Sequence, residues 1–135
     1  MPPSIATDKV CFISVMAREI HAKVPPMEQD PASDATDDNF REILEDFGDD
    51  PMYQELREYI AALDDDERME LLALMWTGRG DFDASEWDEA LAEAQARADA
   101  REPAYLMGTP LVSDYLEEGL AAFDLSCIDF DKRNL

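Results

Sequence analysis

The sequence predicts a single all-α domain over residues 1–135, folded as a bundle of about six helices. Its central helix is apolar on most sides and is expected at about residues 65–77. Three observations support this fold class. Apolar residues recur at steps of three and four, which is the period of one helical face. Acidic residues and prolines stand where helices would begin, and no alternating run of strand length is present.

The first helix is predicted from about residue 8 to residue 24. Thr7 or Asp8 can cap its start, and the pair Pro25-Pro26 stops it. Residues 24–38 are rich in Pro, Asp, Ser and Ala, so we expect an exposed loop there. The apolar stripe of this helix consists of Val10, Ile13, Met16, Ala17, Ile20 and Val24.

Two further helices are expected before the central one. The second ends near Gly48, and the third starts at Asp50-Pro51, where the Asp can cap and the Pro suits the first helical position. Their apolar positions are Phe40, Ile43, Leu44 and Phe47 in the second helix, and Tyr53, Leu56, Ile60 and Leu63 in the third.

The central helix starts with a capping box, in which Asp64 is followed three residues later by Glu67. The fifth helix is expected from about Ala84 to Arg101, with a thin apolar stripe. A short link then leads to Thr109-Pro110, the expected start of the sixth helix. We expect the tail to dock through Leu125, Ile128 and Phe130, with residues 131–135 frayed.

The net charge of −22 is the most pronounced property of the composition, with 33 acidic and 11 basic residues. Direct binding to nucleic acid or to an anionic membrane is therefore not expected, because both need basic surfaces. Many acids fall at predicted helix starts, where carboxylates are stabilising. The excess fits either an acidic surface for solubility or salt tolerance, or a surface that meets a basic partner.

The two cysteines, Cys11 and Cys127, lie in apolar surroundings. We expect two reduced, buried thiols in a cytoplasmic protein, with a long-range disulfide as the alternative. The longest apolar run, residues 10–17, is too short to span a bilayer, and no basic region precedes it as in a signal peptide. These features predict a cytoplasmic location.

No motif predicts a catalytic residue, a metal site or a cofactor. A calcium loop that began at Asp81 would need glycine and glutamate where Glu86 and Ala92 stand. A phosphate cradle around Arg79 would lack a preceding strand and would be repelled by the acids that follow. The single histidine, His21, is expected to be a partly exposed helix residue, because zinc sites need several ligands.

Residues 74–91, LMWTGRGDFDASEWDEAL, look like a joint between two helices. Gly78 is expected to end the central helix in a left-handed turn. Asp83 and Glu86 fit a capping box, with Phe82 and Trp87 at the positions of a hydrophobic staple. The open question is what Arg79 contacts: a nearby acid, or a pocket. The candidate interaction site therefore comprises Arg79, Asp81, Asp83 and Trp87, with Tyr59 as a second aromatic wall of a partner groove.

Three segments together carry a resemblance to a known family: YQELREYIAAL, ELLALMWTGRGDF and YLMGTPLVSDYLEEGLAAF. The chain resembles an uncharacterised bacterial family catalogued as domain of unknown function thirty-seven seventy-five. The resemblance covers most of the chain, and the MW-x-GRGDF segment is its most specific part. It implies a small, acidic, helical bacterial protein and carries over no catalytic residues.

The leading functional hypothesis is a non-enzymatic, acidic cytoplasmic protein that binds another protein, a basic partner being one option, or associates with its own copies. One alternative is a nucleic-acid mimic, whose acidic faces would occupy the basic groove of a DNA-binding protein. The other is a metal-assisted enzyme based on carboxylates, which would need a concave pocket with convergent polar groups.

Overall fold

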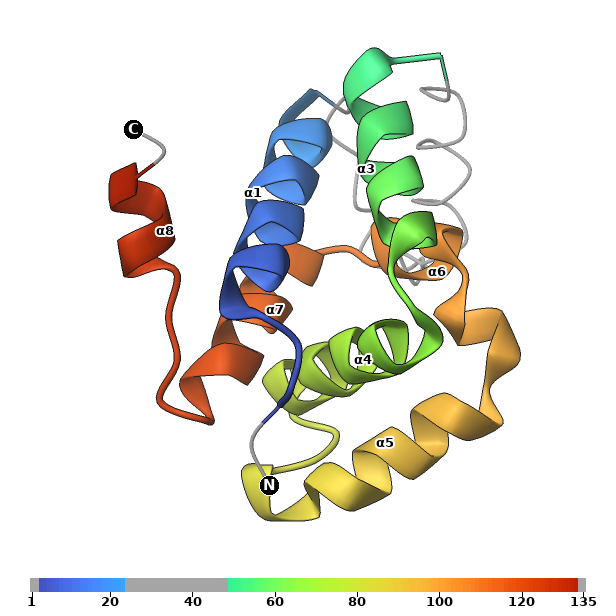
Figure 1. Cartoon of the computed structure of the whole chain (residues 1–135), viewed down its shortest axis with the longest axis vertical. Coiled ribbons are helices and arrows are strands. Elements are labelled where there is room, and N and C mark those ends of the chain that lie inside the picture. Colours follow the sequence, from blue (N-terminus) through green and yellow to red (C-terminus); the bar gives the residue numbers. More distant parts are fainter. Residues whose placement is uncertain (1–2, 24–48, 134–135) are drawn as a thin grey trace, which may run out of the picture.

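Helices form the regular structure in the computed structural model of the chain, which describes residues 3–23 and 49–133 (Figure 1). No β-strand occurs in these ranges, so the predicted all-α class is confirmed. The helix expected around residues 40–47 and the loop expected at 24–38 lie outside the described residues. The elements are α1 (Thr7–Lys23), α3 (Pro51–Ala62), α4 (Asp65–Arg79), the 3₁₀ turn η1 (Ala84–Glu86), α5 (Trp87–Ala96), the 3₁₀ turn η2 (Ala98–Arg101), α6 (Pro103–Met107), α7 (Val112–Ala121) and α8 (Ile128–Arg133).

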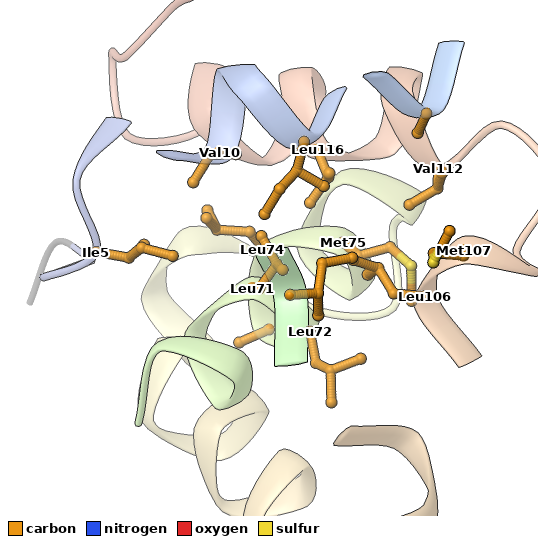
Figure 2. Packing of buried hydrophobic residues seen from close by; sticks show 14 of the residues in the cluster. Ile5, Val10, Leu71, Leu72, Leu74, Met75, Leu106, Met107, Val112 and Leu116 are labelled. Atoms are coloured by element: carbon orange, nitrogen blue, oxygen red, sulfur yellow. The ribbon is translucent and has the colours of Figure 1, made fainter. Parts of the chain in front are cut away.

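Helix α4 is the centre of the fold, as its sequence predicts. Every residue from 71 to 77 is buried, so this helix has no exposed face along two turns. It packs most extensively against α7 and α5, and α7 also packs against α1. Figure 2 shows Leu71, Leu72, Leu74 and Met75 of α4 in the middle of the apolar cluster.

The capping boxes expected from the sequence are present at both predicted helix starts. Asp64 accepts a hydrogen bond from the Glu67 amide (2.8 Å), and the Glu67 side chain accepts one from the Asp64 amide (3.2 Å). Asp83 and Glu86 form the second box. Asp50 likewise accepts hydrogen bonds from the first free amides of α3. These acids therefore serve local structure, because helix N-termini present unpaired N–H groups.

Helices α4 and α7 cross so closely that their backbones touch. A Cβ on Gly78 would lie 1.7 Å from the carbonyl oxygen of Tyr115, and a Cβ on Gly119 would lie 2.2 Å from that of Leu74. Neither position can hold a side chain without moving backbone atoms. The two glycines therefore set the separation of the two helices at the centre of the domain.

The end of α4 corrects the role predicted for Gly78. This residue lies inside the helix, and Gly80 is the left-handed residue that ends it, with φ of 98°. The amide of Gly80 donates to Thr77 (3.1 Å) and that of Asp81 donates to Trp76 (2.9 Å), which is a Schellman motif. The close approach of α7 requires a glycine at 78, and the turn requires the one at 80.

The predicted fifth helix is interrupted at Arg97, which has non-helical φ and ψ of −112° and 83°. Its guanidinium lies 5.8 Å from the ring centre of Trp76 and 5.3 Å from that of Tyr105. Arg101 donates to the carbonyls of Ala94 (3.0 Å) and Gln95 (2.6 Å) at the end of α5. The break is thus stabilised by cation–π contacts and by capping of free carbonyls.

The expected start of the sixth helix is also corrected. The link before it contains α6, and the hydroxyl of Thr109 donates back to Tyr105 (2.8 Å) near the end of α6. Helix α7 begins at Val112, after Leu111 in the left-handed region with φ of 62°. Such a conformation is unusual for a bulky residue and is stabilised by the surrounding structure.

The cysteines contradict the expectation of reduced thiols. Cys11 on α1 and Cys127, just before α8, form a disulfide with a Cα–Cα distance of 5.6 Å. Both residues are buried as expected, but the sequence could not show that they are neighbours.

The expected docking of the tail holds for Leu125 and Phe130, which pack partly buried against the core, whereas Ile128 is 60% exposed. Residues 131–133, expected to fray, belong to α8.

None of the described helices combines the length and the apolarity that crossing a bilayer requires.

Candidate interaction site at the joint between α4 and α5

Residues 80–86 reverse the chain between α4 and α5. After the Gly80 turn, the side chain of Asp83 accepts a hydrogen bond from the Ser85 amide (3.0 Å) and that of Glu86 accepts one from the Asp83 amide (3.0 Å). The box caps η1, a 3₁₀ turn that leads directly into α5. The joint is therefore ordered by its own side chains.

The two aromatic residues expected to staple the joint have their ring contacts elsewhere. Phe82 packs on Trp76, with ring centres 6.3 Å apart. Trp87 is only 3% exposed and meets Phe123 edge to face at 5.1 Å. Through these contacts, Phe82 packs on α4 and Trp87 packs on Phe123, which follows the C-terminal end of α7.

Arg79 is paired with an acid of the same joint. Its Nε donates to Oδ2 of Asp81 (2.8 Å), and Nη2 lies 2.7 Å from the same oxygen. Burial is the largest single influence on the pKa of Arg79 and lowers it, but the hydrogen bond and the charge of Asp81 together with Tyr105 outweigh burial, so the pKa is raised. Of the two contacts considered for Arg79, the structure shows the one with a nearby acid.

A hollow of about 590 Å³ lies beside this joint, against the C-terminal end of α7. Its charged lining is entirely acidic: Asp83 and Glu86 come from the joint and Glu118 comes from α7. Its remaining lining is small or apolar, and consists of Thr77, Gly78, Gly80, Phe82, Ala84, Ala121 and Ala122. A hollow lined by three acidic residues and otherwise by small or apolar ones can receive the apolar stem and charged head of a lysine or arginine.

The five residues predicted for the interaction site are separated by the structure. Arg79, Asp81 and Asp83 lie together at the joint, but only Asp83 lines the hollow. Trp87 is buried beneath Phe123. Tyr59 lies on α3, where its ring centre is 4.5 Å from that of Phe12 and its pKa is raised by burial. Trp87 and Tyr59 therefore do not form opposite walls of this hollow.

The residues that sequence reasoning missed are Glu118, Ala121 and Ala122. They come from α7, about forty positions along the chain from the joint. One signal was present in the sequence: Gly119 interrupts an otherwise regular helical pattern, which indicates a close backbone approach at that turn.

A second acidic hollow, of about 420 Å³, lies near the start of α4 and is lined by Asp64, Asp66, Glu67 and Glu70 among others. Several of its carboxylates already have partners within the chain. Glu70 accepts hydrogen bonds from the amides of Ser4 (2.5 Å) and Ile5 (3.1 Å), and Glu67 pairs with Lys9. At the joint, Asp83 and Glu86 also accept hydrogen bonds from amides of their own capping box, but neither forms an ion pair within the described residues, and Glu118 caps no helix. The hollow at the joint is therefore the better candidate for an external basic ligand.

Metal ligands do not converge in the described residues: no group of three or more His, Cys, Asp or Glu side chains is placed to hold an ion. His21 is half-buried on α1, and its Nε2 lies 3.1 Å from the carbonyl oxygen of Met107. Burial lowers the pKa of His21, and the hydrogen bond to Met107 opposes this only in part.

The model of a family described as protein of unknown function (DUF3775) matches residues 53–125, which is more than half of the chain. The chain belongs to the DUF3775 family. The DUF3775 match includes α4, the joint and α7, and hence the whole lining of the hollow. Cys11 and Cys127 lie outside it. No curated protein and no solved structure matches this DUF3775 chain.

Proposed function

We propose that this DUF3775 chain is a non-enzymatic protein-binding domain, and that the hollow at the joint receives a basic side chain of a partner protein. One observation carries the proposal: three acidic residues and no basic residue line the hollow, and the rest of its lining is small or apolar. The net charge of −22 would attract a basic partner over long range and raise its association rate. The cytoplasmic location expected from the sequence remains part of this proposal.

The lining supports binding better than catalysis. Its only hydroxyl, that of Thr77, donates to the carbonyl of Ala73 (2.7 Å) inside α4. No histidine, cysteine or lysine lines the hollow to act as a nucleophile or to exchange a proton with the carboxylates. The lining residues can orient and neutralise a cation, but they include no nucleophile and no partner for proton transfer.

Mimicry of nucleic acid has less support than the binding of a single basic segment. A mimic needs rows of carboxylates that are available to a partner, yet Asp50 and Asp64 accept hydrogen bonds from helix amides, and Asp50 also pairs with Lys23. Association with a second copy of the chain is opposed at low salt by the repulsion between two highly acidic surfaces. The binding experiment with Glu118 variants also distinguishes mimicry and self-association from the proposed function.

Charge reversal at Glu118 tests the proposal, because this exposed residue lines the hollow without capping a helix. Proteins captured from a cell lysate would be purified and titrated against the wild-type chain, Glu118→Lys and a matched control, Glu55→Lys. Glu55 is equally exposed but lies on α3, away from the hollow. We expect Glu118→Lys to weaken binding about tenfold or more and the control to weaken it less than about threefold.

Equal losses in both variants would mean that net charge alone attracts the partner and that the hollow has no special role. A partner that binds DNA, and that DNA displaces, would instead favour mimicry. Sedimentation of the wild-type chain at several concentrations would reveal self-association, and its loss in Glu118→Lys would identify a second copy as the partner.

A further inference from the structure

The C-terminal segment, residues 124–133, is joined covalently to the opposite end of the chain. The disulfide connects Cys11 and Cys127, which are 116 positions apart in sequence. Figure 1 shows α8 at the edge of the bundle beside α1, reached from α7 by an extended stretch of chain. Cys11 is 0% exposed within α1, and Cys127 is 6% exposed. The bond therefore lies between the segment and the body of the domain.

Only part of this segment is buried. From residue 124 to residue 132, Cys127 is the only buried residue, while Leu125 and Phe130 are half-buried and Ile128 is exposed. Helix α8 has six residues and does not pack extensively against any other helix in the described part of the chain. A helix of this length is not stable in isolation, so its order depends on contacts with the body of the domain, and the disulfide is the covalent one among them.

The body of the domain is held by other contacts. Ser113 and Ser14 exchange hydrogen bonds between side chain and backbone across α1 and α7, at 2.7 and 3.3 Å. Arg18 of α1 also pairs with Glu117 of α7, and Lys9 of α1 pairs with Glu67 of α4. Helix α1 therefore has its own bonds to the core and does not need the disulfide to stay in place.

A backbone turn separates the segment from the body. Asp124 has φ of 59°, and the amide of Leu125 donates to Leu120 (3.0 Å), which closes the C-terminal end of α7. Aspartate tolerates this left-handed conformation better than most residues. The turn belongs to α7, so the chain beyond it can move while α7 remains intact.

We propose that the Cys11–Cys127 bond is a redox latch, whose reduction by a dithiol releases residues 125–133 while α1 and α3–α7 remain folded. Release would uncover the face of α1 that carries Cys11 and would expose Leu125 and Phe130 to solvent. The latch is independent of the hollow at the joint, which lies within the family match and contains neither cysteine.

The reaction is an ordinary thiol–disulfide exchange. A thiolate of the dithiol attacks Sγ of Cys127, which belongs to the less buried of the two cysteines. The bond between Sγ of Cys127 and Sγ of Cys11 breaks, and Sγ of Cys11 leaves as a thiolate that takes a proton from water. The second thiol of the reductant then attacks the mixed disulfide and releases Cys127. Two electrons pass to the chain, both cysteines end as thiols, and the dithiol ends as a disulfide.

Hydrogen exchange followed by mass spectrometry tests the latch on the full chain. Three samples are compared: the oxidised chain, the same chain with dithiothreitol, and Cys127→Ser without reductant. Alkylation with iodoacetamide reports the number of free thiols. We expect exchange in peptides from residues 125–133 to become about tenfold faster or more in the last two samples. Peptides from α4 and α7 should keep their protection, and reoxidation should restore the tail.

Three results would overturn the proposal: thiols that stay unreactive under native conditions with dithiothreitol, a reduced chain whose tail exchanges as slowly as before, or loss of protection in α4 and α7 together with the tail. If Cys127→Ser fails to fold while the reduced wild-type chain retains its core, the wild-type comparison alone decides the question.

Discussion

The crossing of α4 with α7 and the attachment of α8 to α1 are two contrasting ways of holding distant segments together. At the crossing, Gly78 and Gly119 allow backbone to touch backbone, and the contact is entirely noncovalent. At the attachment, little surface is buried and a disulfide supplies the connection. The crossing depends on shape and should be sensitive to one added methyl group. The attachment depends on a bond and should be sensitive to redox state.

The largest effect is expected from Gly78→Ala. The new Cβ would lie 1.7 Å from the carbonyl oxygen of Tyr115, and no rotamer change can relieve a clash between two backbones. We expect the free energy of unfolding to fall by more than about 4 kcal/mol, above the usual cost of overpacking. Urea denaturation followed by circular dichroism measures this loss.

Gly80→Ala is the matched control, because it adds the same methyl group two positions along the chain. No atom lies within 4 Å of the added Cβ, but φ is 98°. Only backbone strain remains, and we expect a loss of about 1–2 kcal/mol. Similar losses in the two variants would contradict a crossing controlled by backbone contact.

Cys127→Ser is expected to have the next largest effect. It opens a covalent loop between residues 116 positions apart, and loss of such a constraint costs about 2–4 kcal/mol. Denaturation with and without dithiothreitol measures it: reductant should lower the stability of the wild-type chain to that of the variant. A reductant effect that persists in Cys127→Ser would show that something other than this bond responds.

Local features were predictable from the sequence, and contacts between distant segments were not. The capping boxes at Asp64–Glu67 and Asp83–Glu86 need only residues three apart, so the pattern sufficed. The apolar run of α4 likewise predicted a central helix. The prediction placed the left-handed end of the helix at Gly78 rather than at Gly80, because both residues suit a helix end and only the approach of α7 distinguishes them.

The same limit applies to the disulfide and to the candidate site. Nothing near Cys11 or Cys127 in sequence indicates that they meet. The sequence located half of the hollow, through Asp83 and the joint, and missed the half that α7 contributes through Glu118 and its alanines. Trp87 was expected as part of a staple and as one wall of a partner groove, but its ring is buried against Phe123 rather than on a surface available to a partner.

Salt should stabilise the whole domain, and its effect should not depend on whether α8 is attached through the disulfide. A net charge of −22 makes the folded surface repel itself, and added ions screen this repulsion. We expect the thermal midpoint to rise by about 2–5 °C between low salt and 1 M NaCl. Oxidised and reduced chains should gain alike. An unchanged or lower midpoint would show that the carboxylates are far enough apart not to interact.

The smallest effect concerns the ion pair between Lys9 of α1 and Glu67 of α4, which supports the body of the domain independently of the latch. The hydrogen bond from Lys9 is the main reason that the pKa of Glu67 lies below its ordinary value of 4.5. The stabilisation is therefore present above that ordinary value and is lost as the pH falls through the lowered pKa of the folded state.

Lys9→Gln should thus lower the thermal midpoint slightly at pH 7, and the difference from the wild-type chain should shrink as the pH falls below 4.5, the ordinary glutamate value. Lys132→Gln removes the same charge from α8, on the segment held by the disulfide, and should show no such pH-dependent difference. If the difference in thermal midpoint from the wild-type chain shrank equally for both variants in acid, the cause would be the overall charge rather than the pair. The pair would then contribute nothing specific to holding α1 against α4.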